Sequence, residues 1–412
     1  MAIALSPGVT VIEKDFTSIV PQISSSACGF AGQFSWGPIL DPLTISSENE
    51  LVERYGKPKN QNFNSFFTAA NFLAYSNNLL LTRIDTKGAR NATVSQSSTV
   101  SAGSFVEGVT YEIVTVGGTD YTDVGAADSE IGTVFVATGD GASNGTGTVR
   151  AVFKIKNVQH YLDVFSLGGS GVGPVAAKWA GELGNSLKVV MCDAANYSSW
   201  AYKSQFSSAP GTSSYAVAHG NSSANDELHI LVIDEDGSIT GQPNTVLEKY
   251  AFVSKASDAK SENGTNNYYR DVLNARSQYV WWTDHPTGVA NWGFPMTSSI
   301  AYTALASAVS ASLAYGANDW SADIGDFEDA YSLFNDVDQY PLAFLAAGKA
   351  DTTLAQYIIS IAESRGDVVA FISPEDAVTG DILIGTSSSV ANSIIAYRDE
   401  LPSTSFAFLD SG

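Results

Sequence analysis

Two kinds of sequence pattern divide this chain of 412 residues and constrain its fold more than any single motif. Between residues 24 and 85, and again after residue 319, short apolar runs alternate with segments whose apolar residues recur every three or four positions. Such alternation is typical of a sheet flanked by helices. Between residues 91 and 175, glycine, serine, threonine and valine form short runs separated by glycine-rich turns. The sequence therefore predicts a multidomain α/β or α+β protein, with an α/β core domain from both chain ends and inserted mainly-β domains.

These changes of pattern also suggest domain boundaries. The expected parts are an N-terminal arm at 1–20, a discontinuous α/β core domain at 21–90 plus 319–412, a small all-β insertion domain at 91–175 and a mixed α/β middle domain at 176–318. The middle parts interrupt a core that begins before them and ends after them.

The arm contains the β-branched run Val9, Thr10, Val11 and Ile12, which has no turn and matching strand directly behind it. A strand of this kind is compatible with an edge strand of its own domain. It is equally compatible with an arm that adds to the sheet of a neighbouring subunit. We take these four residues as the candidate intersubunit contact.

Aromatic residues are concentrated near the start of the chain, in the stretch FAGQFSW. Phe30, Phe34 and Trp36 fall on one face of an extended segment, because side chains alternate along a strand. We expect all three to pack inside the α/β core, closed by residues after 319.

Local signals place several helices. Ser47 and Glu50 have the spacing of a capping box, and Gly56 ends the short helix that follows. Phe67 belongs to the apolar positions of a helix at 64–78, and Ser373 with a proline after it predicts another helix start. Further helices are expected at 323–334, 352–366 and 390–400, and strands at 79–85, 228–233, 340–346 and 367–373.

The middle part contains an acidic run, Asp234 to Gly237, directly after an apolar strand-like run. With Gly237 at loop position six of a calcium-binding EF-hand, Pro243 would occupy position twelve, where that pattern needs glutamate. The run is therefore predicted to be a hairpin turn, with extended structure resuming at Ile239. The Ala/Ser-rich stretch 298–314 is compatible with a helix or with small-residue packing.

The formal net charge is −22, and it is unevenly distributed. Residues 1–90 hold seven acidic and seven basic residues, whereas residues 319–412 hold sixteen acidic and three basic residues. Direct binding of nucleic acid needs clustered lysine and arginine, so this balance argues against it. The acidic segment serves solubility or faces a basic surface of a partner.

No apolar run is long enough to cross a membrane, and the first residues lack the basic start of a signal peptide, so we expect synthesis in a cytoplasm and no membrane insertion. Cys28 and Cys192 lie in apolar, strand-like surroundings and are predicted to be buried thiols, with a disulfide or reactive thiol as the alternative. The four histidines lack metal-ligand spacing. We expect no cofactor.

Motifs that resemble catalytic signatures lack the context that catalysis needs. Ser143 completes a G-x-S-x-G pattern, but it lies in turn sequence without the strand and helix of a nucleophile elbow. The glycine-rich run 168–173 lacks the Lys-Ser/Thr of a phosphate-binding loop. Carboxylates are expected to interact with helix dipoles rather than act in catalysis, and the candidates are Asp323, Asp326, Glu328, Asp329, Asp336 and Asp338. The chain is not predicted to be an enzyme.

Four segments in order resemble the tail sheath protein of contractile-tailed bacteriophages (myoviruses). They are LSPGVTVIEKD near the start, FAGQFSWGPILDPLTISSENELVERYGKP at 30–58, WAGELGNSLKVVM at 179–191 and SIAESRGDVVAFISPED at 360–376. In the third segment Ala180 stands where the family usually has proline.

The resemblance implies a structural subunit of the virion tail that assembles, in the host cytoplasm, into hexameric rings and a helical sheath around the tail tube. Its implied partners are other copies of itself, the tail tube protein, and the baseplate and tail terminator proteins. Contraction would drive the tube through the host envelope. Sheath proteins usually continue past a segment like TSFAFLDSG, so the resemblance implies that this chain lacks the C-terminal domain and would be a soluble monomer.

Two other classes stay open at this point. An α/β ligand-binding protein or hydrolase would show convergent polar side chains at the carboxyl ends of its strands. Another virion structural or adhesin module would explain the glycine- and threonine-rich repeats, but not the four ordered segments.

Overall fold

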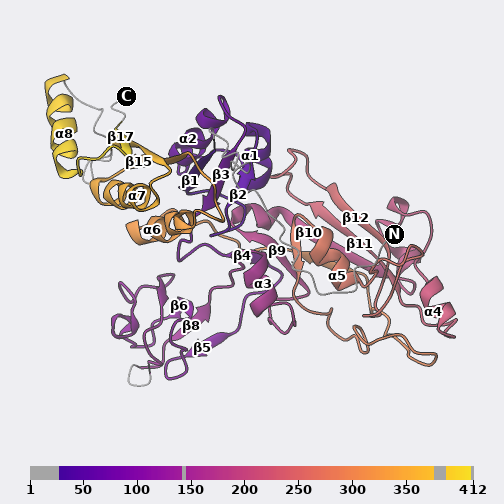
Figure 1. Ribbon diagram of the computed structural model, residues 1–412. Helices are drawn as coiled ribbons and strands as arrows, with labels where there is room; N and C mark the ends of the chain where they lie inside the picture. The colour runs from indigo at the N-terminus through magenta and orange to yellow at the C-terminus, as the bar shows by residue number, and fades with distance from the viewer. Residues whose placement is uncertain (1–26, 142–144, 375–386, 410–412) are drawn as a thin grey trace, which may run out of the picture.

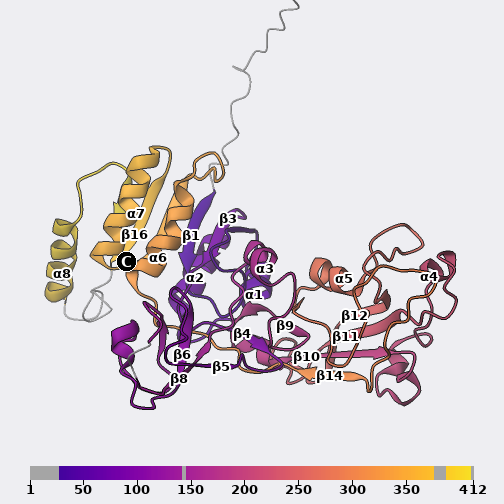
Figure 2. The same ribbon diagram turned by 90° about the horizontal axis from the view of Figure 1, so that it is seen from below.

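The computed structural model describes residues 27–141, 145–374 and 387–409. The described chain forms three lobes (Figures 1 and 2). They are a core sheet with helices, a smaller β lobe, and an elongated middle part that extends away from both. The mixed α/β class predicted from the sequence is confirmed.

The core lobe contains a six-stranded sheet in the order β17-β16-β15-β1-β3-β2. All neighbouring strands are parallel except β2, which is antiparallel to β3. Strand β1 pairs with β15 on one side and β3 on the other, so the two ends of the chain meet at the centre of this sheet. The strands are β1 (Cys28–Gly32), β2 (Leu43–Ile45), β3 (Leu79–Arg83), β15 (Phe344–Ala350), β16 (Val369–Pro374) and β17 (Ala407–Leu409).

Helices cover both faces of this sheet, and on each face their apolar side chains form a separate cluster with those of the strands. One apolar cluster joins α6, α7 and α8 to the sheet through Tyr331, Ile358 and Tyr397. The other joins α1 and α2 to the opposite face, with Leu51 and Phe66 at its centre. The helices are α1 (Glu48–Tyr55), α2 (Phe63–Leu73), α6 (Ile324–Ser332), α7 (Thr352–Arg365) and α8 (Ser387–Glu400).

Helix α1 begins and ends as its sequence predicts. The Ser47 side chain accepts a hydrogen bond from the backbone N–H of Glu50, and Gly56 at φ +85° follows the last turn. The capping box differs in one partner, because the Glu50 carboxylate accepts from the backbone N–H of Ser46 rather than Ser47.

The prediction for the aromatic stretch is correct for two residues and wrong for the third. Phe30 and Phe34 are buried in the core cluster, where the Phe34 ring lies 5.0 Å from that of Tyr55. Trp36 is also buried, but it packs with Val175 and other apolar residues of the middle part. The chain bends at residues 35–37, after Phe34, so Trp36 is no longer on the face that the period of two assigned to it.

Two core predictions need correction, and both errors come from reading local patterns without tertiary contacts. Phe67 lies on the outer side of α2 and is 48% exposed, so it is not a core residue. Ser373 does not start a helix, because it continues β16 and pairs in register with Lys349 of β15. Helix α7 ends at Gly366, which has φ +71°, as predicted.

The β lobe contains a four-stranded antiparallel sheet in the order β5-β8-β6-β7 around a small aromatic cluster that includes Tyr111, Tyr121 and Phe135. Its strands are β5 (Thr99–Ser101), β6 (Thr110–Thr115), β7 (Val134–Val136) and β8 (Thr148–Ala151). The prediction that 91–175 is entirely β is wrong, because helix α3 (Val158–Val164) follows this sheet, capped by the Asn157 side chain.

The middle part contains two antiparallel sheets, in the orders β12-β11-β10-β14 and β13-β9-β4. The β11–β12 hairpin confirms the predicted turn, but Ile239 lies within the connection and extended structure resumes only at Thr245. Within 298–314 the regular element is a strand, not a helix. The elements are β4 (Asn91–Thr93), β9 (Val175–Ala180), β10 (Leu187–Asp193), β11 (Glu227–Asp234), β12 (Thr245–Ser254), β13 (Val280–Trp282), β14 (Val309–Ser312), α4 (Ser214–Ala218) and α5 (Tyr269–Arg276).

Candidate assembly surface

The predicted contact residues Val9, Thr10, Val11 and Ile12 lie outside the described residues. The point at which their segment joins the fold is described. The carbonyl of Ala27 accepts hydrogen bonds from the backbone N–H groups of Ala343 and Phe344, at 2.9 and 3.1 Å. The chain therefore enters the central strand of the core sheet beside β15.

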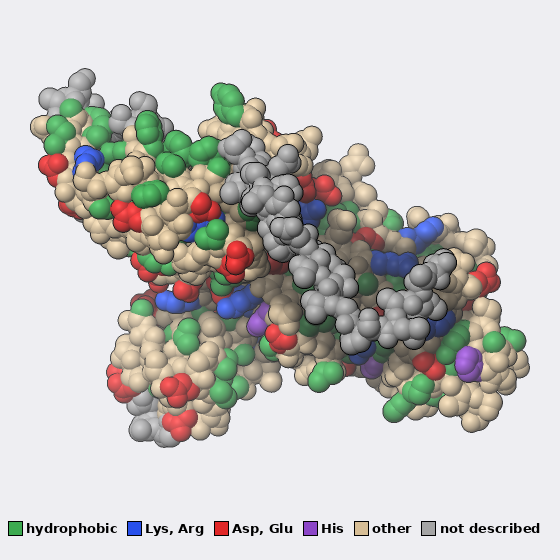
Figure 3. Space-filling view, in the orientation of Figure 1, with side chains coloured by type: hydrophobic (Ala, Val, Ile, Leu, Met, Phe, Trp, Pro, Cys, Tyr) green, Lys and Arg blue, Asp and Glu red, His purple; other side chains and the backbone are tan. Residues whose placement is uncertain are grey.

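Charged side chains connect the core to the parts inserted into it. Asp85, just after β3, forms ion pairs with Lys154 at 2.9 Å and Lys156 at 2.6 Å. Arg90 pairs with Glu112 of the β lobe at 2.8 Å. Figure 3 shows Lys and Arg side chains gathered where the β lobe meets the core. These pairs fix the position of the β lobe relative to the sheet.

The Asp85 site is electrostatically biased toward the charged form. Burial alone would raise the pKa of Asp85, but attraction to Lys154 and hydrogen bonds from Lys156 and Lys154 outweigh it. The pKa of Asp85 consequently lies below its usual value. The Asp85 carboxylate is therefore ionised at neutral pH and forms ion pairs with both lysines.

Two buried cations, which the sequence did not single out, hold the middle part in place. The Arg83 guanidinium donates to the carbonyl of Ala180 at 2.6 Å, and burial lowers its pKa to about 10. Lys178 lies 3.4 Å from the centre of the Trp281 ring and donates to the carbonyl of Ser277 at 2.9 Å. The sequence gives no signal for the contacts of Arg83 or Lys178. The carbonyls of Ala180 and Ser277 and the Trp281 ring are each more than 90 residues away from the cation that they contact.

The carboxyl ends of the central strands give no support to the hydrolase or ligand-binding alternative. From β1 the strand order runs to β3 on one side and to β15, β16 and β17 on the other, so it reverses between β1 and β15. Open α/β sheets bind ligands at the carboxyl ends of the strands at such a point. Gln33, just after β1, donates its side-chain amide to the carbonyl of Trp320 at 3.1 Å. Asp351, just after β15, accepts from the N–H of Leu354 and caps α7. Both side chains serve the fold.

A groove of about 680 Å³ lies elsewhere, between α1 and the middle part. Val52, Leu183, Ile239 and Tyr279 contribute apolar surface, and Lys59 forms a 3.0 Å ion pair with Glu182 across it. Among the described residues that line this groove, none forms a nucleophile–base pair. We assign it no catalytic role.

The motifs that resemble catalytic signatures take structural roles where they are described. Asp323 and Asp326 form a reciprocal capping box at the start of α6, and Asp336 accepts from the N–H groups of Asp338 and Gln339. Ser143 lies outside the described residues, and Gly168 sits against the ring of Trp282.

The cysteine prediction is confirmed: Cys28 and Cys192 are buried free thiols. Burial raises the pKa of each to about 12, so neither is a reactive thiolate. Within the described ranges, no group of three or more His, Cys, Asp or Glu side chains is placed to hold a metal ion. A helix with the length and apolar character to cross a membrane is likewise absent from those ranges.

Comparison with known proteins gives a consistent result. Residues 28–84 match a family model described as the tail sheath protein Gp18 domain III N-terminal region. The tail sheath protein of Vibrio phage KVP40 is 39% identical over 90 residues, which is 22% of this chain and 13% of that protein. Those of Enterobacteria phage T4 and Salmonella phage ViI are each 21% identical, covering 90% and 99% of this chain and 62% and 65% of theirs. The chain thus spans less than two thirds of the length of these relatives.

Two solved structures are also similar. A sheath tail protein from Listeria innocua gives a TM-score of 0.38 at 10% identity, covering 85% of this chain and 50% of that one. A sheath tail protein from Desulfitobacterium hafniense gives 0.36 at 13% identity, covering 95% and 61%.

The matching family model and the three curated relatives are all described as tail sheath proteins. This chain is similar to them over residues 28–84 by the family model, and over most of its length at 21% identity. The family match at 28–84 contains the whole of the predicted sheath-like segment at 30–58, which confirms that part of the resemblance.

Proposed function

We propose that this chain forms part of a structural subunit of a contractile tail sheath, which polymerises as hexameric rings around the tail tube. The observation that carries the proposal is the alignment with sheath proteins over 90% and 99% of the chain. A role in the virion without catalysis also fits the structural use of the polar side chains at the central strands.

The proposed domain division places the core at 21–90 plus 319–412, with the β lobe and the middle part projecting from it. Its support is the six-stranded sheet, in which β1 lies between β3 and β15. In this arrangement the core faces the tail tube, and the baseplate and tail terminator contact the ends of the sheath. We propose assembly in the host cytoplasm, with no direct nucleic-acid contact and no membrane insertion.

Contraction, as proposed, requires no hydrolysis by this chain. Energy would reside in a metastable packing of identical subunits and be released when rigid domains repack about their connecting arms. Residues Val9 to Ile12 would add to a neighbouring sheet, and backbone hydrogen bonds would hold subunits together during the movement. The acidic 319–412 segment would supply charged contacts between neighbours.

Labelling of intact virions tests the function. Antibody raised against this chain should decorate the tail of the encoding phage along its whole length, in the extended and the contracted state. Label restricted to the capsid, to fibres or to the tail tip would contradict the sheath assignment.

The arm requires a separate experiment in the complete sheath protein. Deletion of residues 1–15 should abolish ordered sheaths in electron micrographs and leave the circular dichroism spectrum of the subunit unchanged. Normal sheaths formed by that deletion would refute the arm assignment.

A further inference from the structure

Three phenylalanines form a row across neighbouring strands of the core sheet. The Phe344 ring of β15 lies 5.5 Å from the Phe371 ring of β16, which lies 5.7 Å from the Phe408 ring of β17. Phe371 and Phe408 are direct partners in the strand register, so they point to the same face. They are 42% and 59% exposed, which is unusual for aromatic residues in a parallel sheet.

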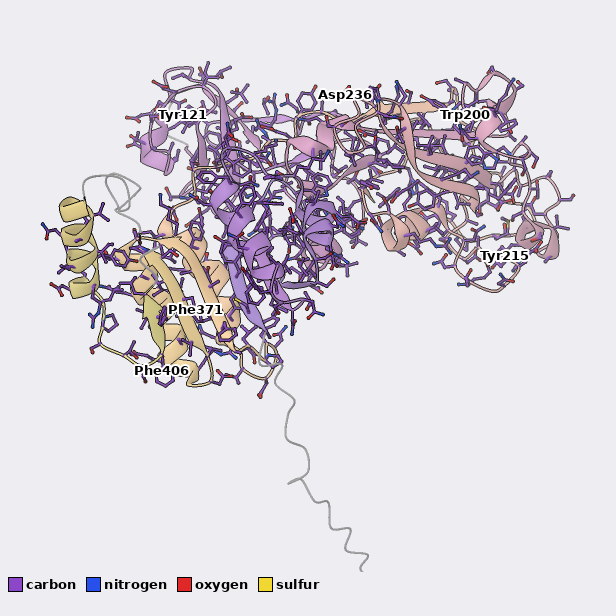
Figure 4. All side chains as sticks on the ribbon, turned by 90° about the horizontal axis from the view of Figure 1, so that it is seen from above. Tyr121, Trp200, Tyr215, Asp236, Phe371 and Phe406 are labelled. Atoms are coloured by element: carbon purple, nitrogen blue, oxygen red, sulfur yellow. The ribbon has the colours of Figure 1, made fainter. Side chains whose placement is uncertain are left out.

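The two faces of the sheet are covered to different extents. Leu345, Ala370 and Ile372 point to the face that α6, α7 and α8 cover. On the opposite face, α2 packs against β1, β3 and β15. Seen from below, α6 and α7 lie in front of the sheet (Figure 2), whereas from above the strands around Phe371 carry no helix (Figure 4). The phenylalanine row thus lies on the part of the sheet that α2 leaves open.

Exposed aromatic residues also lie on α2, which packs on the same face of the sheet, in a segment without charge. Phe63 and Phe67 on the outer side of α2 are 52% and 48% exposed, and Tyr75 beyond its end is 94% exposed. Residues 63–78 contain no charged residue, although the chain has 43 acidic and 21 basic residues. Aromatic enrichment with charge depletion is the composition of an interface centre. A segment that covers this surface should itself be apolar and uncharged.

One stretch of this chain has that composition and joins the fold beside the row. The sequence FTSIVPQISSS, residues 16–26, has no charged residue and carries Phe16, Ile19, Val20 and Ile23. It lies outside the described residues, which begin at Ala27. The Ala27 carbonyl accepts from the N–H of Phe344, the first member of the row.

The distance is short enough for the same chain to reach. Three strand spacings separate β1 from β17, about 14 Å in all. Phe408 also lies three register positions beyond Ala27, about 10 Å along the strands. The seven residues from Val20 to Ala27 span about 23 Å when extended, which exceeds the combined distance of about 17 Å. We propose that residues 16–23 pack on Phe371 and Phe408 of their own chain and cover the open part of the sheet. This inference goes beyond the proposed function, since it would anchor the base of the N-terminal arm on the core.

Photo-crosslinking of the complete chain tests the proposal. p-Benzoylphenylalanine placed at Phe408 should crosslink to residues 16–23. In a mixture of ¹⁵N-labelled and unlabelled protein, the crosslinked peptides should carry one label only. The same probe at Ile131, which is 69% exposed on the β lobe, is the matched control and should not reach that segment. Mixed-label crosslinks, crosslinks to another region or none from Phe408 would overturn the proposal.

Truncation provides an independent readout. Deletion of residues 1–23 should raise hydroxyl-radical oxidation of Phe371 and Phe408 several-fold, whereas deletion of 1–15 should leave it unchanged. Equal oxidation in both deletions would overturn the anchor. The sheath function is judged separately by tail labelling, so failure of one does not imply failure of the other.

Discussion

Asp85 and Lys154 are 69 residues apart in sequence and form an ion pair of 2.9 Å that joins the end of β3 to the segment after the β lobe. Lys154 also donates to the carbonyl of Thr86 at 2.8 Å. The side chains are only 16% and 11% exposed, so water contributes little to their solvation. Of the three ion pairs described at this junction, this one has the most buried side chains, so we expect it to make a measurable contribution to stability.

Replacing Asp85 should destabilise the protein strongly. Asp85→Asn leaves two lysines without a carboxylate, one of them largely buried, and we expect a loss of about 3 kcal/mol in the free energy of unfolding. Urea denaturation at pH 7 measures it. Lys87→Met is the control, because the Lys87–Asp323 pair is more than half exposed, and we expect a change below about 0.5 kcal/mol. Equal effects of the two variants would contradict this account.

Lys178 should make stability depend on pH in the alkaline range. Burial lowers its pKa from 10.5 to about 8, despite attraction to Glu248. Between these values the unfolded chain binds more protons at this position, so its contribution to the free energy of unfolding rises with pH. The Lys178→Met variant should lack this contribution. Denaturation of both proteins between pH 8 and 10.5 tests it, and identical pH profiles would show that Lys178 titrates normally.

The two glycines that end α1 and α7 should respond differently to alanine. Gly366 has φ +71° and open space where a Cβ atom would lie, so Gly366→Ala should cost about 1 kcal/mol from backbone strain alone. At Gly56, with φ +85°, a Cβ atom would lie 2.5 Å from the Ser35 hydroxyl. Ser35 is itself buried and bonded to the carbonyl of Tyr55. Gly56→Ala should therefore be clearly more destabilising in thermal unfolding, and the reverse order would be inconsistent with these geometries.

Asp234 should be required for the β11–β12 connection, independently of calcium. Its carboxylate accepts hydrogen bonds from the Ser186 hydroxyl, the Thr240 hydroxyl and the backbone N–H of Thr240, each within 2.7 Å. Asp234→Ala should lower the free energy of unfolding by more than about 2 kcal/mol. The exposed Asp236, labelled in Figure 4, is the control, and its alanine variant should behave like the parent protein.

Calcium provides a second check on the same loop. Because the acidic side chain at its centre is already satisfied by protein donors, millimolar calcium and excess EDTA should give the same midpoint of thermal unfolding. A midpoint that calcium raises would mean that the loop binds the ion after all.

Several features of this protein are determined within a few residues, and the sequence alone predicted them. Ser47 caps α1, Gly366 ends α7 and the apolar run before Arg83 forms β3, because caps, left-handed glycines and apolar runs act locally. The sheath resemblance at 30–58 also came from sequence, since the family match depends on residue order.

Long-range contacts set which surfaces each element packs against. Trp36 follows the same aromatic pattern as Phe30 but packs against the middle part, and Ser373 continues a strand because β15 is available as its partner. Arg83 and Lys178 are held by backbone carbonyls distant in sequence, which no local pattern encodes. The open row at Phe371 and Phe408 likewise depends on where α2 stops covering the sheet. Burial and pairing are set by the free energy of the whole fold, so residues with similar local sequence take different roles.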